Sequence, residues 1–306
     1  MSSKREHTLW VEKYRSQTLE DYVGNENIKQ TIGHYLKQND IQNFLFYGTA
    51  GTGKTTLAKL IVNNLDCEYL YINASDENGI DTIREKVKGF ASVASFKPFK
   101  VVILDEADYI TIQGQAALRN IIETFSRSTR FILTCNYIER VIDPLQSRCQ
   151  IFNLTPPLEG ILNRIIFILK SEGIQVPVEE KSKLVELVRN GYPDLRRIIN
   201  DIQKFSYNGT LSIKENNARG LAEKVVNKIL QKNDPSELRK FVIERESEFS
   251  NDYLQLMKEM FETIFKLGID QNKKSSLLLT ISEGMYKDAI VVDKEINWFS
   301  TCLKIY

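Results

Sequence analysis

A short run rich in glycine and hydroxyl residues, Gly48 to Thr55, has the composition of a phosphate-binding loop. It matches the pattern G-x-x-x-x-G-K-[ST], with Gly48, Gly53, Lys54 and Thr55 at the fixed positions. In such a loop, backbone N–H groups surround phosphate oxygens, the lysine reaches the terminal phosphates and the hydroxyl binds Mg²⁺. An apolar run precedes the loop and a helical pattern follows it, as the motif requires. The run therefore predicts a nucleoside-triphosphate site.

Two adjacent acidic residues, Asp105 and Glu106, follow the apolar run 101–104. An acid at the end of a buried strand stands where open parallel sheets place their ligands. We expect Asp105 to hold hydrated Mg²⁺, and Glu106 to orient an attacking water or take its proton. Taken alone, the pair is equally typical of a solvated turn. Downstream of the phosphate loop, it favours hydrolysis over binding alone.

Apolar runs alternate with helical patterns over about half of the chain. The apolar runs predict strands near 44–48, 68–73, 101–104, 131–134 and 151–154. Apolar residues at helical spacing predict helices near 55–65, 83–93 and 115–125. This alternation predicts an α/β fold in which helices cover both faces of a parallel sheet.

The pattern changes at Thr155-Pro156-Pro157, because proline interrupts both helices and strands. Beyond this point the periodicity is helical alone, and it predicts helices near 158–169, 179–189, 194–205 and 218–231. Asn233-Asp234-Pro235 marks a second boundary, and an apolar stripe from Tyr253 to Ile264 predicts a core-facing helix. We therefore predict a nucleotide-binding domain over 1–154, a helical lid over 155–229 and a further helical domain over 230–306.

The composition excludes several other classes of protein. Lys and Arg total 41 and Asp and Glu total 40, so the formal net charge is +1 and any basic surface must be local. No apolar run approaches the ~18 residues of a membrane helix. The N-terminal region has no apolar segment of the kind found in secretory signals, so we expect no such signal. The four cysteines are far apart in sequence and lack zinc-ligand spacing. We expect a cytoplasmic protein that does not associate with membranes.

Several further motifs make the sequence recognisable. They are Trp10-Val11-Glu12-Lys13-Tyr14-Arg15, Val23-Gly24, Asn73-Ala74-Ser75-Asp76, Leu104-Asp105-Glu106-Ala107-Asp108 and Ser147-Arg148-Cys149. Together with the phosphate loop, they resemble the AAA+ clamp-loader ATPases, which are the small subunits of replication factor C and their phage counterparts. The segments 90–96, 144–149 and 192–196 are most similar to the ATPase subunit of the T-even-type phage loaders.

The resemblance implies a RecA-like ATP-binding domain, a small helical lid and an all-α collar that assembles subunits. It implies ATP and Mg²⁺ as cofactors, with the metal held by Thr55 and Asp105. The residues that it places around ATP are Val11, Glu12, Lys13, Tyr14, Val23, Gly51, Thr52, Gly53, Lys54, Thr55, Thr56 and Arg196.

The resemblance also implies a catalytic set of Lys54, Glu106, Asn136 and Arg148. Asn136 would orient the hydrolytic water, and Arg148 would act in trans, as an arginine finger that enters the neighbouring subunit's site. Considered singly, Asn136 also fits a turn residue, and Arg148 and Arg196 also fit surface ion pairs.

Basic and apolar residues near the acidic pair are candidates for contacts with macromolecules. Arg84 and Lys88 are spaced i,i+4 on a predicted helix, and Arg119 lies on the next helix. The resemblance implies that these residues bind the DNA backbone, which requires charge and no reading of sequence. A lone basic pair is otherwise typical of a solvated helix face. Tyr109, Ile110 and Ile112 are implied to contact the sliding clamp, although simple packing under the sheet explains them equally.

The sequence therefore favours an ATP-dependent sliding-clamp loader subunit, which would open the clamp and load it on primer–template DNA. The resemblance implies a pentamer of further copies of this chain and a second, non-ATPase subunit, in a host cytoplasm if the source is a phage. Two alternatives stay open. One is another AAA+ DNA ATPase, such as an initiator or a branch-migration motor. The other is a nucleotide-bound scaffold, against which Glu106 and Asn136 argue.

Overall fold

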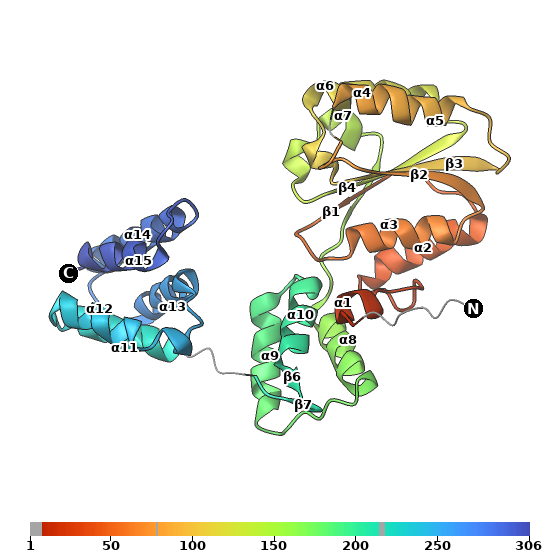
Figure 1. The fold of residues 1–306 in the computed structure, drawn as a ribbon. Coiled ribbons are helices and arrows are strands. Elements are labelled where there is room, and N and C mark those ends of the chain that lie inside the picture. The colour runs from red at the N-terminus through yellow and green to blue at the C-terminus, as the bar shows by residue number, and fades with distance from the viewer. Residues whose placement is uncertain (1–7, 78, 214–217) are drawn as a thin grey trace. The chain divides into compact units, whose positions relative to one another are not determined.

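The computed structural model describes residues 8–77, 79–213 and 218–306 (Figure 1). Its contacts divide the chain into two units, Met1–Ile213 and Lys214–Tyr306. No helix among the described residues has the length and the apolar character needed to cross a bilayer. All of the motifs that predict chemistry lie in the first unit.

A five-stranded parallel sheet in the order β2-β3-β4-β1-β5 forms the centre of the first unit. Its strands are β1 (Phe44–Tyr47), β2 (Cys67–Asn73), β3 (Phe99–Asp105), β4 (Thr129–Cys135) and β5 (Gln150–Asn153). In this register, Phe44 of β1 is opposite Ile132 of β4 and Gln150 of β5. The carboxyl ends of β1, β4 and β3 therefore share one edge, and the predicted α/β fold is confirmed.

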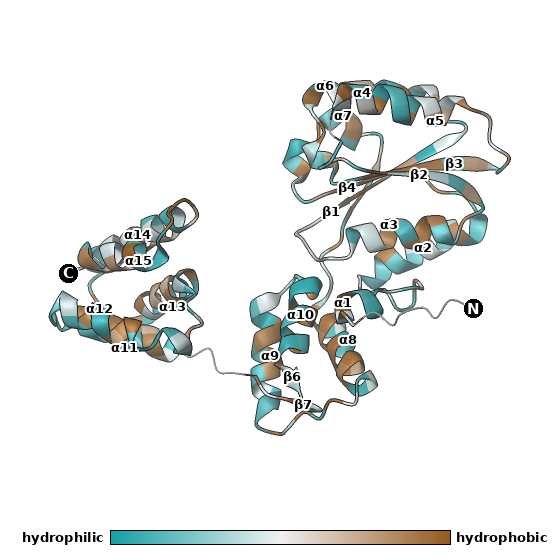
Figure 2. Cartoon of the chain, in the orientation of Figure 1, coloured by the Kyte–Doolittle hydropathy of each residue, from teal (hydrophilic) through white to brown (hydrophobic). Residues whose placement is uncertain are grey.

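Apolar side chains of the sheet alternate between its two faces and bury a helical layer on each. In β3, Val101 and Ile103 join the cluster of Leu57, whereas Val102 and Leu104 join the cluster of Leu118. Figure 2 shows the middle of the sheet as largely hydrophobic, as expected for strands that are buried on both faces. In Figure 1, one layer holds α2 (Glu26–Gln38) and α3 (Lys54–Asn63), and the other holds α4 (Ile80–Thr82), α5 (Lys88–Ser92), α6 (Ile112–Thr124) and α7 (Asp143–Gln146).

The segment that was expected to form one helix over 83–93 changes its helical type. Residues Ile83–Val87 form a π-helical turn between α4 and α5. Ile83 and Val87 are both buried in the cluster that includes α6. A π-turn is wider than an α-turn, so the α-helical spacing assumed for Arg84 and Lys88 does not hold across this junction.

The lid has an apolar cluster of its own, enclosed by α8 (Leu158–Ser171), α9 (Glu180–Gly191) and α10 (Leu195–Phe205). A small hairpin of β6 (Ser206–Tyr207) and β7 (Thr210–Leu211) corrects the expectation that this region is purely helical. Its turn, Asn208-Gly209, has φ angles of 51° and 76°, which suit a two-residue hairpin. Strands of two residues carry no readable alternation, so the sequence pattern could not reveal them.

The N-terminal helix α1 (Trp10–Lys13) packs with the lid. Trp10 is buried in the same cluster as Ile165 and Ile198, and α1 contacts α10. The predicted domain 1–154 is therefore wrong at its beginning, because this segment belongs to the core of the lid. A buried indole contributes a large apolar area, which decides where so short a helix packs.

The second unit is helical and contains α11 (Ala218–Leu230), α12 (Pro235–Ile243), α13 (Tyr253–Lys266), α14 (Gln271–Asp288) and α15 (Lys294–Leu303), with a 3₁₀ turn at Glu246–Glu248. The stripe predicted on α13 is buried, as expected for a core-facing helix. Leu221 and Val225 of α11 belong to this same core. The boundary predicted at 229/230 is therefore wrong and lies ahead of Ala218, because α11 buries its apolar face in the second unit.

Candidate functional site

The phosphate loop joins β1 to α3, which begins at Lys54. Gly51 and Gly53 have φ angles of 74° and 87°, in a region that residues with side chains rarely adopt. A Cβ on Gly51 would stand 1.7 Å from Asp194 Oδ1 at the start of α10, and one on Gly53 would stand 2.9 Å from the Tyr22 ring. Glycine is therefore required here by the backbone and by two close neighbours, one of which belongs to the lid.

The ammonium group of Lys54 is enclosed by oxygen acceptors. Its Nζ donates to the backbone oxygens of Gly48 and Thr49 and to Oδ1 of Asn136, each at 2.8 Å. Burial lowers the pKa of Lys54. Because β1 and β4 are neighbours in the sheet, the loop lysine and the asparagine after β4 meet in the fold.

Three hydroxyl groups surround the carboxylate of Asp105 at the end of β3. Thr55 Oγ1 donates to it at 2.9 Å, Tyr71 OH at 2.8 Å and Thr134 Oγ1 at 2.6 Å. Burial and then the bond to Asp105 raise the pKa of Tyr71, so its phenol remains a donor. Among the described residues, no group of three or more His, Cys, Asp or Glu side chains could hold a metal alone. Thr55 and Asp105 nevertheless fit Mg²⁺, which prefers oxygen ligands and usually shares its site with substrate phosphates.

Glu106 follows directly after β3 and has a left-handed backbone conformation, with φ of 57° and ψ of 44°, which is uncommon outside glycine. Its N–H donates to Thr134 Oγ1 at 3.0 Å, so Thr134 contacts both acidic residues. A 3₁₀ turn, Ala107–Tyr109, follows. Strained backbone of this kind recurs at functional sites, and Glu106 lines the pocket beside the phosphate loop.

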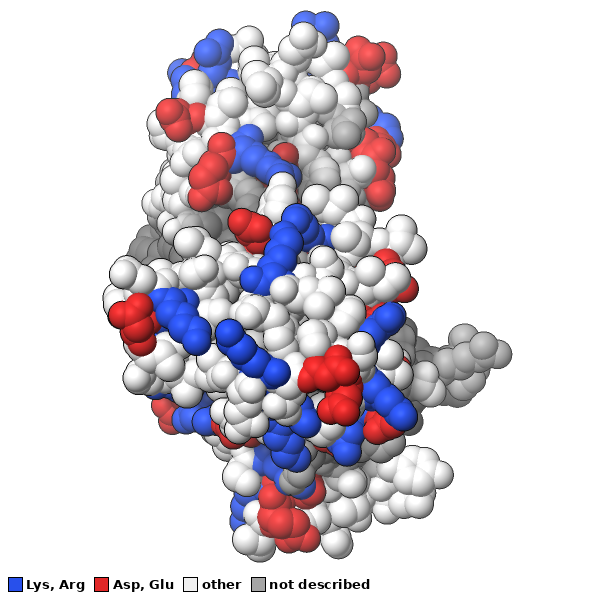
Figure 3. Space-filling model, turned by 90° about the vertical axis from the view of Figure 1, so that its left-hand side faces the viewer, with Lys and Arg blue, Asp and Glu red and all other residues white. Residues whose placement is uncertain are grey.

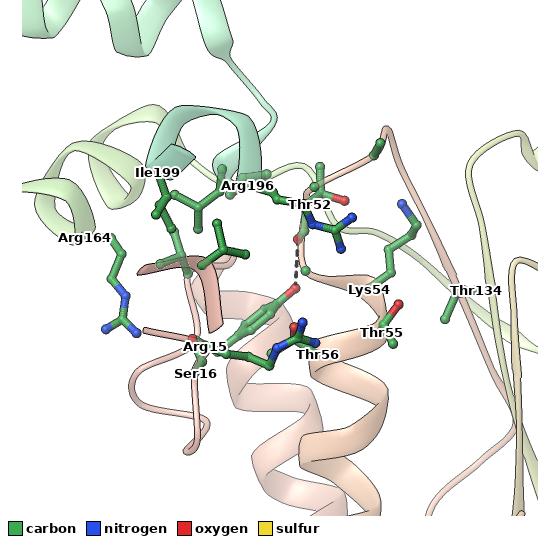
Figure 4. Close-up of a pocket in the computed structure, with 18 of the residues that line it drawn as sticks. Arg15, Ser16, Thr52, Lys54, Thr55, Thr56, Thr134, Arg164, Arg196 and Ile199 are labelled. Carbon is green, nitrogen blue, oxygen red and sulfur yellow. Dashed lines mark hydrogen bonds between the residues drawn. The ribbon is translucent and has the colours of Figure 1, made fainter. Parts of the chain in front are cut away.

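One pocket of about 980 Å³, its open mouth included, connects the phosphate loop with the lid. Figure 4 shows Lys54, Thr55 and Thr134 on one side of the pocket, and Ser16, Arg164 and Ile199 on the other. The phosphate half is lined by Ala50, Gly51, Thr52, Gly53, Lys54, Thr55, Thr56, Asp105, Glu106, Thr134 and Asn136, and the base half by Val11, Tyr14, Arg15, Ser16, Tyr22, Val23, Pro156, Arg164, Leu195 and Ile199.

Cations outnumber acids around this pocket. Arg15, Lys54, Arg164 and Arg196 line it, against Asp105 and Glu106. Figure 4 shows Arg196 of α10 beside Thr52 of the phosphate loop. An excess of positive charge in a cleft attracts a polyanion. The apolar residues of the base half suit the planar, less polar end of a nucleotide.

Ten of the predicted ATP residues line the pocket: Val11, Tyr14, Val23, Gly51, Thr52, Gly53, Lys54, Thr55, Thr56 and Arg196. Glu12 and Lys13 do not line it, which corrects their assignment. Glu12 pairs with Arg15 at 2.6 Å, and Lys13 pairs with Glu172 of the lid at 2.9 Å. Successive residues of a helix point in different directions, so a run of neighbours in a motif cannot all face one ligand.

Several lining residues belong to no motif that would predict them. Arg164 and Ile199 come from lid helices without a local signal, and Tyr22, whose OH donates to Thr52 O at 3.4 Å, is identified only by its packing. Thr134 had a readable signal, because it is the hydroxyl residue at the end of the predicted strand 131–134, two positions before Asn136. Asp108 ends the acidic motif but was given no role; it does not line the pocket, and its Oδ2 accepts from the N–H groups of Asn136 and Tyr137 at 3.2 Å.

Comparisons with known proteins agree with this geometry. A family model described as "ATPase family associated with various cellular activities (AAA)" matches residues 44–157, and one described as "Sliding-clamp-loader large subunit, AAA+ ATPase lid domain" matches residues 158–215. The replication factor C small subunit of Archaeoglobus fulgidus is 33% identical over 316 residues, which cover 97% of this chain and 98% of the relative. This chain belongs to the replication factor C small-subunit family. The family protein of Saccharolobus solfataricus is 38% identical over 250 residues, covering 79% of this chain and 72% of that protein.

The arginine of the family's Ser-Arg-Cys motif does not line the pocket of its own chain. Arg148 lies between α7 and β5, and its Nε donates to Glu123 Oε1 of α6 at 2.9 Å. Its Nη2 also donates to Glu123, and its Nη1 donates to the backbone oxygen of Pro144. The Arg148 guanidinium lowers the pKa of Glu123. Within one chain Arg148 is thus a surface ion-pair partner, and its role in a neighbouring site stays a prediction.

The predicted DNA residues lie on neighbouring helical elements. α4 and the π-turn contact α6, Arg84 and Lys88 are exposed, and Arg119 is half-buried. Figure 3 shows one face of the molecule, on which positive and negative side chains are interspersed. Contact of these three residues with DNA stays a prediction.

Other basic residues of the same region are engaged within the chain. Lys86 pairs with Glu77, and Lys97 pairs with Asp66. Lys100 is 3% exposed and donates to the backbone oxygens of Phe90 and Val93 at the end of α5. Lys100 therefore fixes the end of a helix and is not a surface charge.

The predicted clamp residues fall into two groups. Tyr109 and Ile112 are 47% and 74% exposed, whereas Ile110 is 3% exposed and packs in the cluster beneath the sheet. Ile110 cannot contact a partner, and its assignment is corrected because alternating residues of this turn face inward and outward. Tyr137, which directly precedes the adjoining 3₁₀ turn Ile138–Arg140, is exposed too. Tyr109, Ile112 and Tyr137 leave apolar surface outside the fold.

Proposed function

We propose that this chain is an ATP-hydrolysing subunit of a pentameric sliding-clamp loader, which it forms together with further copies of itself and a second, non-ATPase subunit. The observation that carries the proposal is the convergence of Lys54, Asn136, Asp105 and Glu106 at one edge of the sheet, opposite a lid that supplies Arg196. Membership of the replication factor C small-subunit family supports it.

Each of these groups has a role that its surroundings support. Thr55 and Asp105 would hold Mg²⁺, which neutralises phosphate charge when bound. Lys54 contacts the developing charge on the terminal phosphate, and Asn136, whose Oδ1 is 2.8 Å from Lys54 Nζ, orients the attacking water. Glu106 accepts the proton of that water.

Arg148 is the cation that completes the site of the neighbouring subunit. The Arg148 side chain lies outside its own pocket and pairs with the exposed Glu123, and exposed ion pairs of this kind contribute little to stability. Such a pair is weak enough to be exchanged for a terminal phosphate during assembly. ATP hydrolysis then depends on the ring, and a finger of this type contributes about 10³–10⁵ in rate.

The remaining surfaces supply the partners of the reaction. Arg84, Lys88 and Arg119 bind the backbone of primer–template DNA, and Tyr109 and Ile112 contact the clamp. The C-terminal unit forms the collar of the ring. The two relatives described above are archaeal, and an origin in a phage, with action in the host cytoplasm, is our expectation from the sequence.

The decisive experiment is Arg148→Ala in the assembled complex. ATP affinity should be unchanged, whereas turnover stimulated by clamp and primed DNA should fall about 10³-fold or more. Arg127→Ala, which removes an exposed charge just beyond α6, is the matched control and should leave both unchanged.

Native turnover in Arg148→Ala would contradict the trans role. Stimulation by origin or junction DNA, and not by clamp with primed DNA, would favour an initiator or a branch-migration motor. An assembled wild-type complex without turnover would favour a scaffold. Native mass of the chain mixed with candidate partners, with and without a non-hydrolysable ATP analogue, tests the pentamer.

A further inference from the structure

The segment Leu9–Tyr14, here called the strap, is bound to the lid at both of its ends. At the first end, Trp10 N–H donates to Gln203 Oε1 at 3.0 Å, and Gln203 Nε2 donates to Thr8 O at 2.7 Å. The Trp10 ring is buried in the lid cluster. Because Val11 and Tyr14 line the base half of the pocket, the strap presents nucleotide-facing residues on the surface of the lid.

At the second end of the strap, Tyr14 is held by helix α8 at three points. Arg164 Nη2 donates to the Tyr14 backbone oxygen at 2.7 Å. The Phe167 ring stands edge-on to the Tyr14 ring, with centroids 6.3 Å apart and an interplanar angle of 89°. The Tyr14 hydroxyl donates to Glu172 Oε1 at 2.7 Å. These contacts fix the carbonyl, the ring and the hydroxyl, so Tyr14 has little freedom to turn independently of α8.

Glu172 binds two adjacent residues of the strap, Lys13 and Tyr14. Its Oε1 accepts from the Tyr14 hydroxyl and lies 2.9 Å from Lys13 Nζ, and its side chain is only 18% exposed. Burial raises the pKa of Glu172, but the bonds from Lys13 and Tyr14 outweigh that effect and the pKa is lowered. Glu172 does not itself line the pocket, so it can act on a ligand only through the strap.

The position of Glu172 is one that local rules disfavour. It is the C-cap of α8, where the helix dipole is negative and a carboxylate is unfavourable. A residue that breaks a local preference requires a compensating tertiary contact. Here that compensation is the pair of donors from the strap, about 160 residues earlier in the chain.

We propose that Glu172 is a positioning residue for the nucleoside: it holds Lys13 and Tyr14 on the lid, so that Val11 and Tyr14 present the surface on which the base binds. The phosphate half is built on the sheet and does not depend on this contact. Affinity for the base should therefore respond to Glu172, while affinity for phosphate alone should not. The inference rests on the proposed function in that it requires ATP to bind in this pocket.

The test compares two ligands, ATP and inorganic tripolyphosphate, each with Mg²⁺, by titration calorimetry on the full chain. Glu172→Ala should weaken the binding of ATP about fivefold, which is the effect of one lost hydrogen bond, and should leave the affinity for tripolyphosphate unchanged. Tyr14→Phe should have the same effect, and the double variant should be no worse than either single variant. Glu172→Gln keeps an acceptor for the Tyr14 hydroxyl and should recover most of the ATP affinity.

Glu186→Ala, which removes an exposed carboxylate from α9, is the matched control and should change neither affinity. Equal losses for ATP and tripolyphosphate in Glu172→Ala would overturn the inference, because they would mean general disruption of the domain. Unchanged ATP affinity would overturn it too, while leaving the proposed function intact. A wild-type chain that binds no ATP would overturn both.

Discussion

The two halves of the nucleotide pocket are built in different ways. In the phosphate half, Gly51, Gly53, Lys54 and Thr55 are neighbours in the chain, and Asp105 and Asn136 are brought to them by adjacent parallel strands. In the base half, Val11 comes from the N-terminal helix α1, whereas Arg164 and Ile199 come from the lid helices α8 and α10, more than 150 residues later. A loop and a hydrogen-bonded sheet therefore form the first half, and side-chain packing between strap and lid forms the second.

This difference separates the energetics of the two halves. The hydrogen bonds of the sheet hold the phosphate half whether or not the lid is in place. The base half exists only while the strap is packed on the lid, so a nucleotide that binds there stabilises this packing by mass action. Variants in the phosphate half should consequently change the affinity for tripolyphosphate, whereas variants in the base half should not.

The largest effect is expected in the phosphate half, from Glu106→Gln. The amide cannot accept the proton of the attacking water, so turnover should fall about 10²–10⁴-fold while ATP affinity is kept. Single-turnover hydrolysis in the assembled complex measures this change. Glu139→Gln, on the exposed turn Ile138–Arg140, should be neutral, and native turnover in Glu106→Gln would remove Glu106 from the catalytic set.

Lys54→Ala should weaken the binding of ATP and of tripolyphosphate about 100-fold each, because it removes a buried ammonium group that would donate several charge-assisted hydrogen bonds to phosphate. Titration calorimetry with both ligands measures it. Lys59→Ala, on the exposed face of α3, is the control. A loss confined to ATP would mean that Lys54 belongs functionally to the base half.

Ile199→Ala should weaken the binding of ATP about fivefold and leave the affinity for tripolyphosphate unchanged. The reason is that it removes apolar contact from the base half and no contact from the phosphate half. Ile202→Ala, on the same helix and buried in the same cluster away from the pocket, is the matched control for lost lid stability. If both variants weaken ATP equally, lid stability and not base contact explains the effect.

The smallest effect is expected from Tyr22→Phe at the junction of the two halves. It removes one long hydrogen bond, from the Tyr22 hydroxyl to Thr52 O at 3.4 Å, and keeps the ring that packs against Gly53. ATP affinity should fall about twofold. A loss above tenfold in the same titration would show that the phenol takes part in binding directly.

Much of the fold and of the phosphate half could be predicted, because both depend on local rules. Strand runs such as 101–104 predict a sheet buried on both faces, and a glycine-rich loop before a helix predicts phosphate binding. The failures follow from tertiary contacts that the sequence does not reveal: Ile110 faces the core and Lys13 pairs with Glu172 of the lid. Residue type and spacing do not determine which face of a short turn points inward.

The sequence alone determined the phosphate loop, the acidic pair at the end of β3 and the family, because glycine geometry and helix starts act within a few residues. Only the tertiary structure decided that Trp10 packs in the lid, that α11 belongs to the C-terminal core and that Glu172 binds Tyr14. These contacts join segments that the chain keeps far apart, and they form only where complementary apolar and polar surfaces pack against each other.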